Sequence, residues 1–137
     1  MPIVYRIDHD ARLVVAAGYG VFTPAAVFDY QREVWSRPDV KGYDELIDMS
    51  RVTRIEVSEP HRMKELAALS ASTDDAAGSS RFAIVAPADI AYGLGRMFQT
   101  YRELNPKSTK SVGVFRTMEE ALAYLEIDSA VTVPETP

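Results

Sequence analysis

The feature that most constrains the fold of this chain is a regular alternation of β-rich runs and amphipathic helical segments. The β-rich runs cover residues 2–8, 11–20, 44–50, 81–87 and 111–115. Helical patterns begin at Thr23, near Glu59, at Asp89 and at Thr117. Parallel neighbouring strands need a crossover connection, so the order β-β-α-β-α-β-α-β-α predicts right-handed βαβ units and a mixed, mostly parallel sheet. The expected fold class is therefore an α/β sandwich with about four helices.

Local signals at the ends of elements support this order. Thr23 is a good N-cap and is followed by a proline, which suits the first helical position. Thr117 has a glutamate three residues on, the spacing of a capping box. Gly18 and Gly20 are expected to end the second strand, and residues 51–57 are expected to form a turn or a short extended piece.

Length and composition indicate one globular domain. A chain of 137 residues has the usual size of a single domain, and its 47% hydrophobic and 26% charged residues are ordinary for a globular protein. We expect residues 1–126 to form this single domain. Residues 127–137 are expected to form a flexible C-terminal tail, because little in their composition would hold them in place.

Composition also excludes several classes of function. The chain has no cysteine, which rules out disulfides, thiolate metal sites and cysteine nucleophiles. Its net charge of −5 argues against nucleic-acid binding, which needs a clustered basic face. No apolar run is long enough for a membrane span and the first residues lack a signal-peptide layout, so we expect a cytoplasmic protein. His9 and His61 lie in unrelated elements, and we predict no metal or cofactor site.

Several stretches of the sequence resemble the STAS domain, the fold of bacterial anti-sigma-factor antagonists. In that family a strand ending in an Asp-Leu-Ser-like turn leads to Asp-Ser-Ser-Gly at the start of the second helix. Here "DMSRVTRIEVSEPH" has residues 48–50 in the first role and residues 56–59 in the second. "RFAIVAPADIAYGLGRMFQTYRE" and "VGVFRTMEEALAYL" are similar to the closing pattern of the SpoIIAA-like subgroup, also described as STAS/SEC14-like. The resemblance covers about residues 3–126.

The resemblance implies a non-enzymatic regulatory or protein-interaction domain with a vestigial phosphoacceptor region. Only Ser58 falls at the position of the family's phosphorylated serine, while Glu56, Val57 and Glu59 stand where the family has aspartate, serine and glycine. The alternative role of Ser58 is to cap the second helix, a contribution of about 1 kcal/mol. We favour the cap, because the carboxylates of Glu56 and Glu59 would repel a phosphate between them.

The charged residues around Ser58 form the predicted surface for a protein partner. They are Arg51, Arg54, Glu56, Glu59, His61 and Arg62. Ser58, His61 and Glu65 share a helical face, but nothing marks a nucleophile elbow, so we do not predict an enzyme. Because soluble proteins often form symmetric dimers, a second copy of this chain is a further candidate partner.

The alternative function is that of a carrier for a small apolar or lipid-like ligand. Gly93 and Gly95 each cost about 1 kcal/mol relative to alanine in a helix interior, which indicates tight packing on the sheet or, as the alternative, room for a ligand. The candidate pocket under the second and third helices consists of Met63, Gly93, Leu94, Arg96, Met97 and Phe98. Such a carrier predicts an enclosed cavity above about 300 Å³.

Overall fold

The computed structural model describes residues 3–56, 59–128 and 131–135. These residues form a five-stranded sheet in the order β1-β2-β3-β4-β5. The strands are β1 (Ile3–Asp8), β2 (Leu13–Phe22), β3 (Asp44–Ile55), β4 (Arg81–Val85) and β5 (Ser111–Phe115). The helices are α1 (Pro24–Trp35), the 3-10 helix η1 (Pro38–Val40), α2 (Pro60–Ser72), α3 (Asp89–Glu103) and α4 (Met118–Tyr124).

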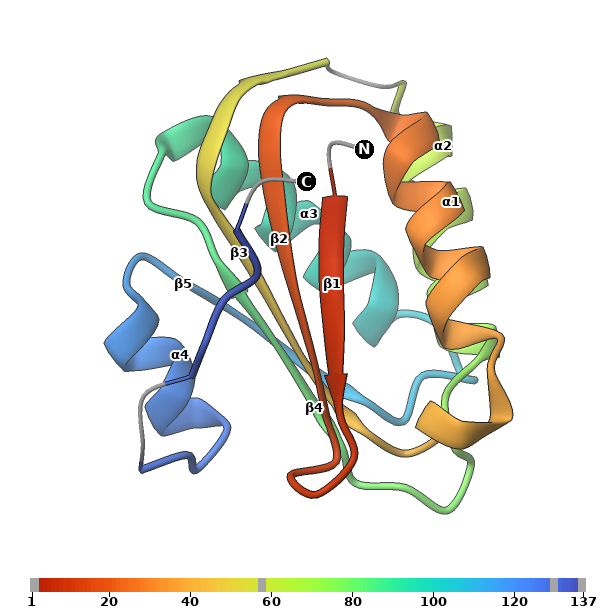
Figure 1. The fold of residues 1–137 in the computed structure, drawn as a ribbon. Coiled ribbons are helices and arrows are strands. Elements are labelled where there is room, and N and C mark those ends of the chain that lie inside the picture. Colours follow the sequence, from red (N-terminus) through yellow and green to blue (C-terminus); the bar gives the residue numbers. More distant parts are fainter. Residues whose placement is uncertain (1–2, 57–58, 129–130, 136–137) are drawn as a thin grey trace.

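The sheet is mixed, with one antiparallel pair. β1 runs antiparallel to β2, and the other neighbouring pairs are parallel. The crossovers through α1, α2 and α3 advance in the same direction across the sheet, so right-handed connections put these helices on one face. α4 and the C-terminal residues 131–135 cover the other face (Figure 1). The predicted α/β sandwich with a mixed, mostly parallel sheet is confirmed.

The central strands supply a hydrophobic cluster to each face of the sheet. Val14 and Ile47 belong to the cluster under α1, α2 and α3, whereas Val15 and Leu46 belong to the cluster under α4. Successive side chains of a strand point to opposite faces, so a strand that is covered on both faces is expected to be mainly apolar on both. This two-sided cover explains the continuous apolar runs in the sequence.

The C-terminal residues 131–135 lie against the second face of the sheet. Two valines of this segment pack on the cluster under α4. Arg6 donates from Nε to the carbonyl oxygen of Thr132 over 2.6 Å, and the hydroxyl of Tyr19 donates to that of Pro134. The expectation that little holds the tail is therefore wrong for these residues.

β2 and β3 extend further than the sequence predicts. Their pairing continues until Phe22 lies opposite Ile55, past two shifts of register. Gly20 has a φ of +63°, which glycine adopts without steric cost, and it allows an irregularity within β2 instead of ending the strand. Residues 51–55 are therefore part of one long strand and not a separate turn or short piece.

The predicted helix caps are confirmed for α1 and α4 but not for α2. The Oγ1 atoms of Thr23 and Thr117 each accept a hydrogen bond over 3.2 Å from the amide three residues on. α2 begins at Pro60, and its N-cap is Glu59. A proline in the first helical position makes the residue before it the cap, so the prediction that Ser58 occupies this position is wrong. Ser58 itself lies outside the described residues.

Candidate ligand pocket

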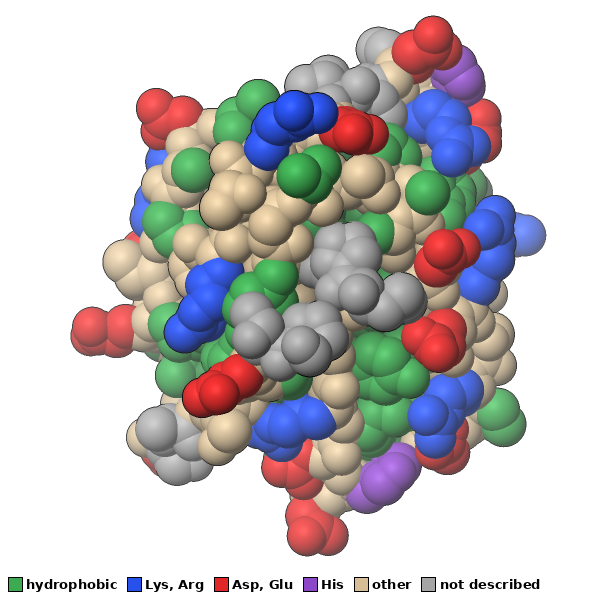
Figure 2. Space-filling model, turned by 45° about the horizontal axis from the view of Figure 1, so that its top comes forward, with side chains coloured by type: hydrophobic (Ala, Val, Ile, Leu, Met, Phe, Trp, Pro, Cys, Tyr) green, Lys and Arg blue, Asp and Glu red, His purple; other side chains and the backbone are tan. Residues whose placement is uncertain are grey.

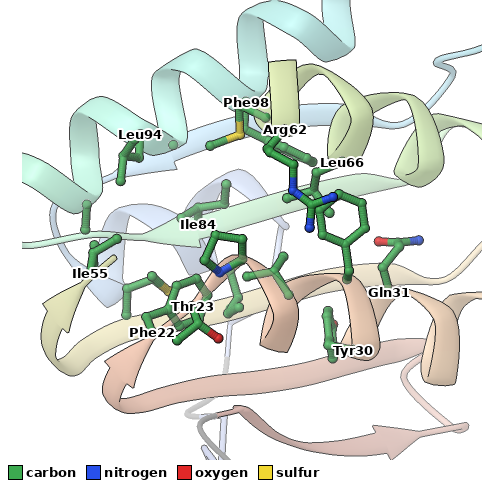
Figure 3. Close-up of a pocket in the computed structure, with 18 of the residues that line it drawn as sticks. Phe22, Thr23, Tyr30, Gln31, Ile55, Arg62, Leu66, Ile84, Leu94 and Phe98 are labelled. Atoms are coloured by element: carbon green, nitrogen blue, oxygen red, sulfur yellow. The ribbon is translucent and has the colours of Figure 1, made fainter. Parts of the chain in front are cut away.

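An apolar pocket of about 130 Å³ lies between α1, α2, α3 and the sheet (Figure 3). Its apolar lining consists of Phe22, Pro24, Val27, Phe28, Ile47, Met49, Ile55, Met63, Leu66, Phe82, Ile84, Ala91, Leu94, Gly95 and Phe98. The more exposed lining residues come from the ends of β2 and β3 and the starts of α1 and α2. The mouth of the pocket therefore lies at the carboxyl ends of the strands, where α/β sheets usually bind ligands.

The pocket exists because three helices converge on one sheet face without filling the space between them. Phe82 of β4 meets Phe98 of α3 edge to face, with ring centroids 5.9 Å apart. Gly95 lets α3 approach the sheet closely, since an added Cβ there would lie 3.0 Å from Val114. The long β3 carries Ile55 to the mouth, beyond the end of β4.

The deep end of the pocket is polar and built around Glu45. Its Oε2 accepts hydrogen bonds from the hydroxyl of Tyr30 over 2.8 Å and from Nε1 of Trp35 over 3.1 Å. Its Oε1 lies 3.6 Å from Nζ of Lys110, and Nζ lies 3.5 Å from the centroid of the Trp35 ring. Tyr30 and Glu45 reach the pocket surface, so its inner end carries a carboxylate whose oxygens already have partners.

Burial dominates the electrostatics of this polar end. It raises the pKa of Glu45, although the charge of Lys110 opposes the rise. It lowers the pKa of Lys110, although Glu45 opposes that change. Burial, reinforced by the charge of Glu45, also raises the pKa of Tyr30 well above its ordinary value. In both members of the ion pair, desolvation therefore outweighs their mutual attraction.

The mouth of the pocket carries one charge of each sign. The guanidinium carbon of Arg62 lies 4.5 Å from the centroid of the Phe28 ring, and its Nη1 lies 3.5 Å from Oε2 of Glu65. Glu56 also lines the pocket, with Oε1 3.6 Å from Nη2 of Arg54. Arg62 thus borders the apolar space, with a long contact to its carboxylate partner.

The structure places one residue of the predicted interaction surface, Arg51, on a different face of the sheet from the others. Arg54, Glu56, Glu59 and His61 are exposed and Arg62 is half-exposed. Glu56 and Arg62 line the pocket, and the other three are their neighbours in the chain. Nδ1 of His61 lies 3.2 Å from Oε2 of Glu59. Arg51 packs over Tyr19, whose hydroxyl bonds to the C-terminal segment, so it lies on the opposite sheet face. Acidic and basic side chains are interspersed over the face seen in Figure 2.

The structure brings together half of the predicted pocket residues. Met63, Leu94 and Phe98 line the pocket, whereas Gly93, Arg96 and Met97 are exposed on the outer side of α3. The cavity volume is less than half of the value expected for a carrier of lipid-like ligands. The α1 residues of the lining were missed, although Phe28 and Trp35 are seven apart and indicated that α1 has a buried side.

The glycines of α3 predict opposite effects on stability. Gly93 has open space where a Cβ would be, so Gly93→Ala should raise the free energy of unfolding by about 0.5–1 kcal/mol through helix propensity. At Gly95 the same change forces a methyl group against the stiff side chain of Val114, so Gly95→Ala should lower the free energy of unfolding by about 1 kcal/mol. Urea denaturation of the two variants measures both, and a stabilised Gly95→Ala variant would contradict the close packing.

Comparison with known proteins bears on the fold. No protein-family model matches the chain, and a search of curated proteins found no match. Among solved structures, the chain is similar to an uncharacterised protein of the DUF3478 family with a SpoIIAA-like fold from Shewanella loihica PV-4. The match has a TM-score of 0.55 and 14% sequence identity, and it covers 90% of this chain and 93% of that chain. Within the described residues, no helix has the length and hydrophobicity required to cross a membrane. This chain has a SpoIIAA-like fold, as the resemblance of its sequence implied.

Proposed function

We propose that this domain acts by binding and not by catalysis, and that its pocket takes a small apolar molecule. The observation that carries the proposal is the lining, in which apolar side chains from three helices and three strands surround about 130 Å³. Ligand sites in proteins are typically cavities of this character with a few placed polar groups. Here those groups lie at the two ends, near Glu45 and near Arg62.

The size of the pocket restricts the ligand. An engineered apolar cavity of about 150 Å³ takes one benzene molecule. A cavity of about 130 Å³ therefore fits a group of about six carbon atoms. The proposed ligand is smaller than the lipid-like molecule that the resemblance suggested.

Benzyl alcohol is expected to bind in this pocket and to shift the methyl signals of selected methionines. Met49 and Met63 line the pocket, whereas Met97 is 39% exposed on α3 and Met118 of α4 packs on the opposite face of the sheet. In a protein labelled with ¹³C at the methionine methyl groups, titration should move the first two signals and leave the other two in place. Equal shifts at Met97 and Met49 would contradict binding in the pocket.

A matched pair of variants tests the same site by filling it. Val27 lines the pocket and Val21 is exposed on β2, so Val27→Phe adds a ring inside and Val21→Phe adds the same ring outside. Val27→Phe should abolish the shifts of Met49 and Met63, because the new ring occupies the ligand's space. Val21→Phe should leave them unchanged. Retained binding in a folded Val27→Phe variant would refute the proposal.

Recognition of a protein partner is a second candidate function. It is favoured by the exposed charges of Arg54, Glu59 and His61, whose ion pairs among the described residues are with other exposed side chains, Glu56 for Arg54 and Glu59 and Glu65 for His61. A partner that contacts these residues would cover the mouth and respond to a ligand inside. Arg54→Glu should then weaken the complex with that partner while the benzyl alcohol shifts persist. Loss of both together would show that the substitution damages the fold.

A further inference from the structure

We infer that the ligand of this pocket is a small carboxylic acid, with its apolar part inside and its carboxylate paired with Arg62 at the mouth. The inference rests on the proposed function and adds the chemical class of the ligand. It draws on three observations: the position of Arg62, the commitments of the two acidic residues in the lining, and the helix ends around the mouth.

Arg62 is placed to meet an anion at the end of an apolar molecule. Figure 3 shows its side chain extending from α2 across the pocket towards α1. Its guanidinium lies over Phe28, a ring of the lining, so it borders the apolar space directly. Among the described residues, the guanidinium donates one hydrogen bond, from Nη1 to Glu65 over 3.5 Å. A planar guanidinium has five donors in a fork that matches a carboxylate, so most of its capacity is left for a ligand.

Both acidic residues of the lining already have a basic side chain beside them. Glu45 at the deep end accepts from Tyr30 and Trp35 and pairs with Lys110. Glu56 at the mouth is paired with Arg54, which lies outside the lining. At the deep end, a cationic ligand would have to displace one of the partners of Glu45. At the mouth, Glu56 is exposed and its Oε1 lies 3.6 Å from Arg54, whereas the guanidinium of Arg62 lies directly over the Phe28 ring of the lining.

Helix ends at the mouth favour the same charge. Thr23 and Pro24 at the start of α1, Arg62 in the first turn of α2 and Ala91 in the first turn of α3 all line the pocket. The positive ends of three helix dipoles therefore surround this end of the cavity. They add to the attraction of Arg62 for a carboxylate.

The test compares three probes of one shape and different charge: benzoate, benzyl alcohol and benzylamine. Dissociation constants come from the methyl shifts of Met49 and Met63, which report the pocket itself. Benzoate should bind about tenfold more tightly than benzyl alcohol, as expected for one charge-assisted hydrogen-bonded pair. Benzylamine should bind most weakly of the three.

Matched variants assign the preference to Arg62. Arg62→Gln should remove the preference, so that benzoate and benzyl alcohol bind with the same affinity, and Arg62→Lys should retain part of the preference. Arg32→Gln is the control, because Arg32 lies 5.3 Å from the same Phe28 ring but is not part of the lining. It should leave all three affinities unchanged.

The outcomes separate this inference from the function on which it rests. Equal binding of benzoate and benzyl alcohol would overturn the carboxylate class while the apolar pocket stands. Tightest binding of benzylamine would overturn it in favour of Glu56. If none of the three probes shifts the methyl signals of Met49 and Met63, both proposals are overturned.

Discussion

Replacing Asp74 with alanine is expected to lower the free energy of unfolding by about 3–5 kcal/mol, because it leaves a buried charge without its partner. The side chains of Arg102 and Asp74 are 1% and 3% exposed. Nη2 of Arg102 donates to both carboxylate oxygens, over 2.7 and 2.9 Å. A guanidinium keeps its proton at any ordinary pH, so the stranded charge cannot be neutralised.

A second loss adds to the first. The carboxylate of Asp74 also accepts from the backbone amides of Thr109, over 2.9 Å, and Lys110, over 3.0 Å. These bonds fix the connection between α3 and β5 against the loop after α2, so their removal leaves partly buried donors unpaired.

Urea denaturation monitored by circular dichroism measures the effect of Asp74→Ala as a lower midpoint. Asp29→Ala is the control, since Asp29 pairs with Arg32 at 4.0 Å on the exposed side of α1 and should leave the midpoint unchanged. A wild-type midpoint for Asp74→Ala would show that the buried pair contributes nothing to stability.

Lys110→Met is expected to destabilise the protein at neutral pH by about 3–5 kcal/mol, again by stranding a buried charge. Glu45 would retain its hydrogen bonds from Tyr30 and Trp35 but lose its counter-ion. Unlike an arginine, a stranded glutamate can be neutralised by taking up a proton. The deficit should therefore depend on pH.

The direction of this dependence follows from the pKa of Glu45. Burial raises that pKa in the folded protein, and Lys110 opposes the rise, so the pKa climbs further in Lys110→Met. When the pKa of a group is higher in the folded protein than in the unfolded chain, the group contributes stability at pH values below its pKa in the unfolded chain. This contribution is lost as the pH rises through its pKa in the folded protein. The deficit should be smallest near the unfolded glutamate pKa of about 4.3 and should grow towards neutral pH.

To test this, the urea midpoints of wild type and Lys110→Met are compared at about pH 4.5, close to the unfolded pKa of glutamate, and at about pH 7.5, well above it. Lys107→Met is the matched control, because Lys107 is exposed in the same connection between α3 and β5. It should show no pH-dependent deficit. A deficit of Lys110→Met that is equal at both pH values would show that Glu45 does not carry the stranded charge.

The element order was predictable from the sequence because local patterns determine it. The apolar runs, the helical periodicity and the capping threonines at positions 23 and 117 act within a few residues, and the structure keeps all of them. The extension of β3 to Ile55 was not predictable, because pairing with β2 overrides the charged and polar composition of residues 51–54. The predicted cap of α2 is one residue too early, because α2 begins at Pro60 and its N-cap is Glu59.

The candidate site could be predicted only in part. Periodicity in α2 and α3 indicated Met63, Leu94 and Phe98, since the buried side of a helix is visible in its spacing. It could not show which buried residues pack closely and which border a cavity, because that depends on how elements meet. The buried partners Glu45 and Lys110 were invisible for a similar reason: they are far apart in the chain, and only the adjacency of β3, β4 and β5 brings them together.

The strand order has a consequence for how the chain assembles during synthesis. The order of the strands in the sheet is their order in the chain, so each new strand pairs with the strand made just before it. Each pairing therefore closes a loop no longer than one crossover connection. The sheet can therefore grow from β1 as the polypeptide leaves the ribosome. Its face towards α4 has no cover until the last helix emerges, so nascent chains that stall before that point expose Leu46 and its neighbours.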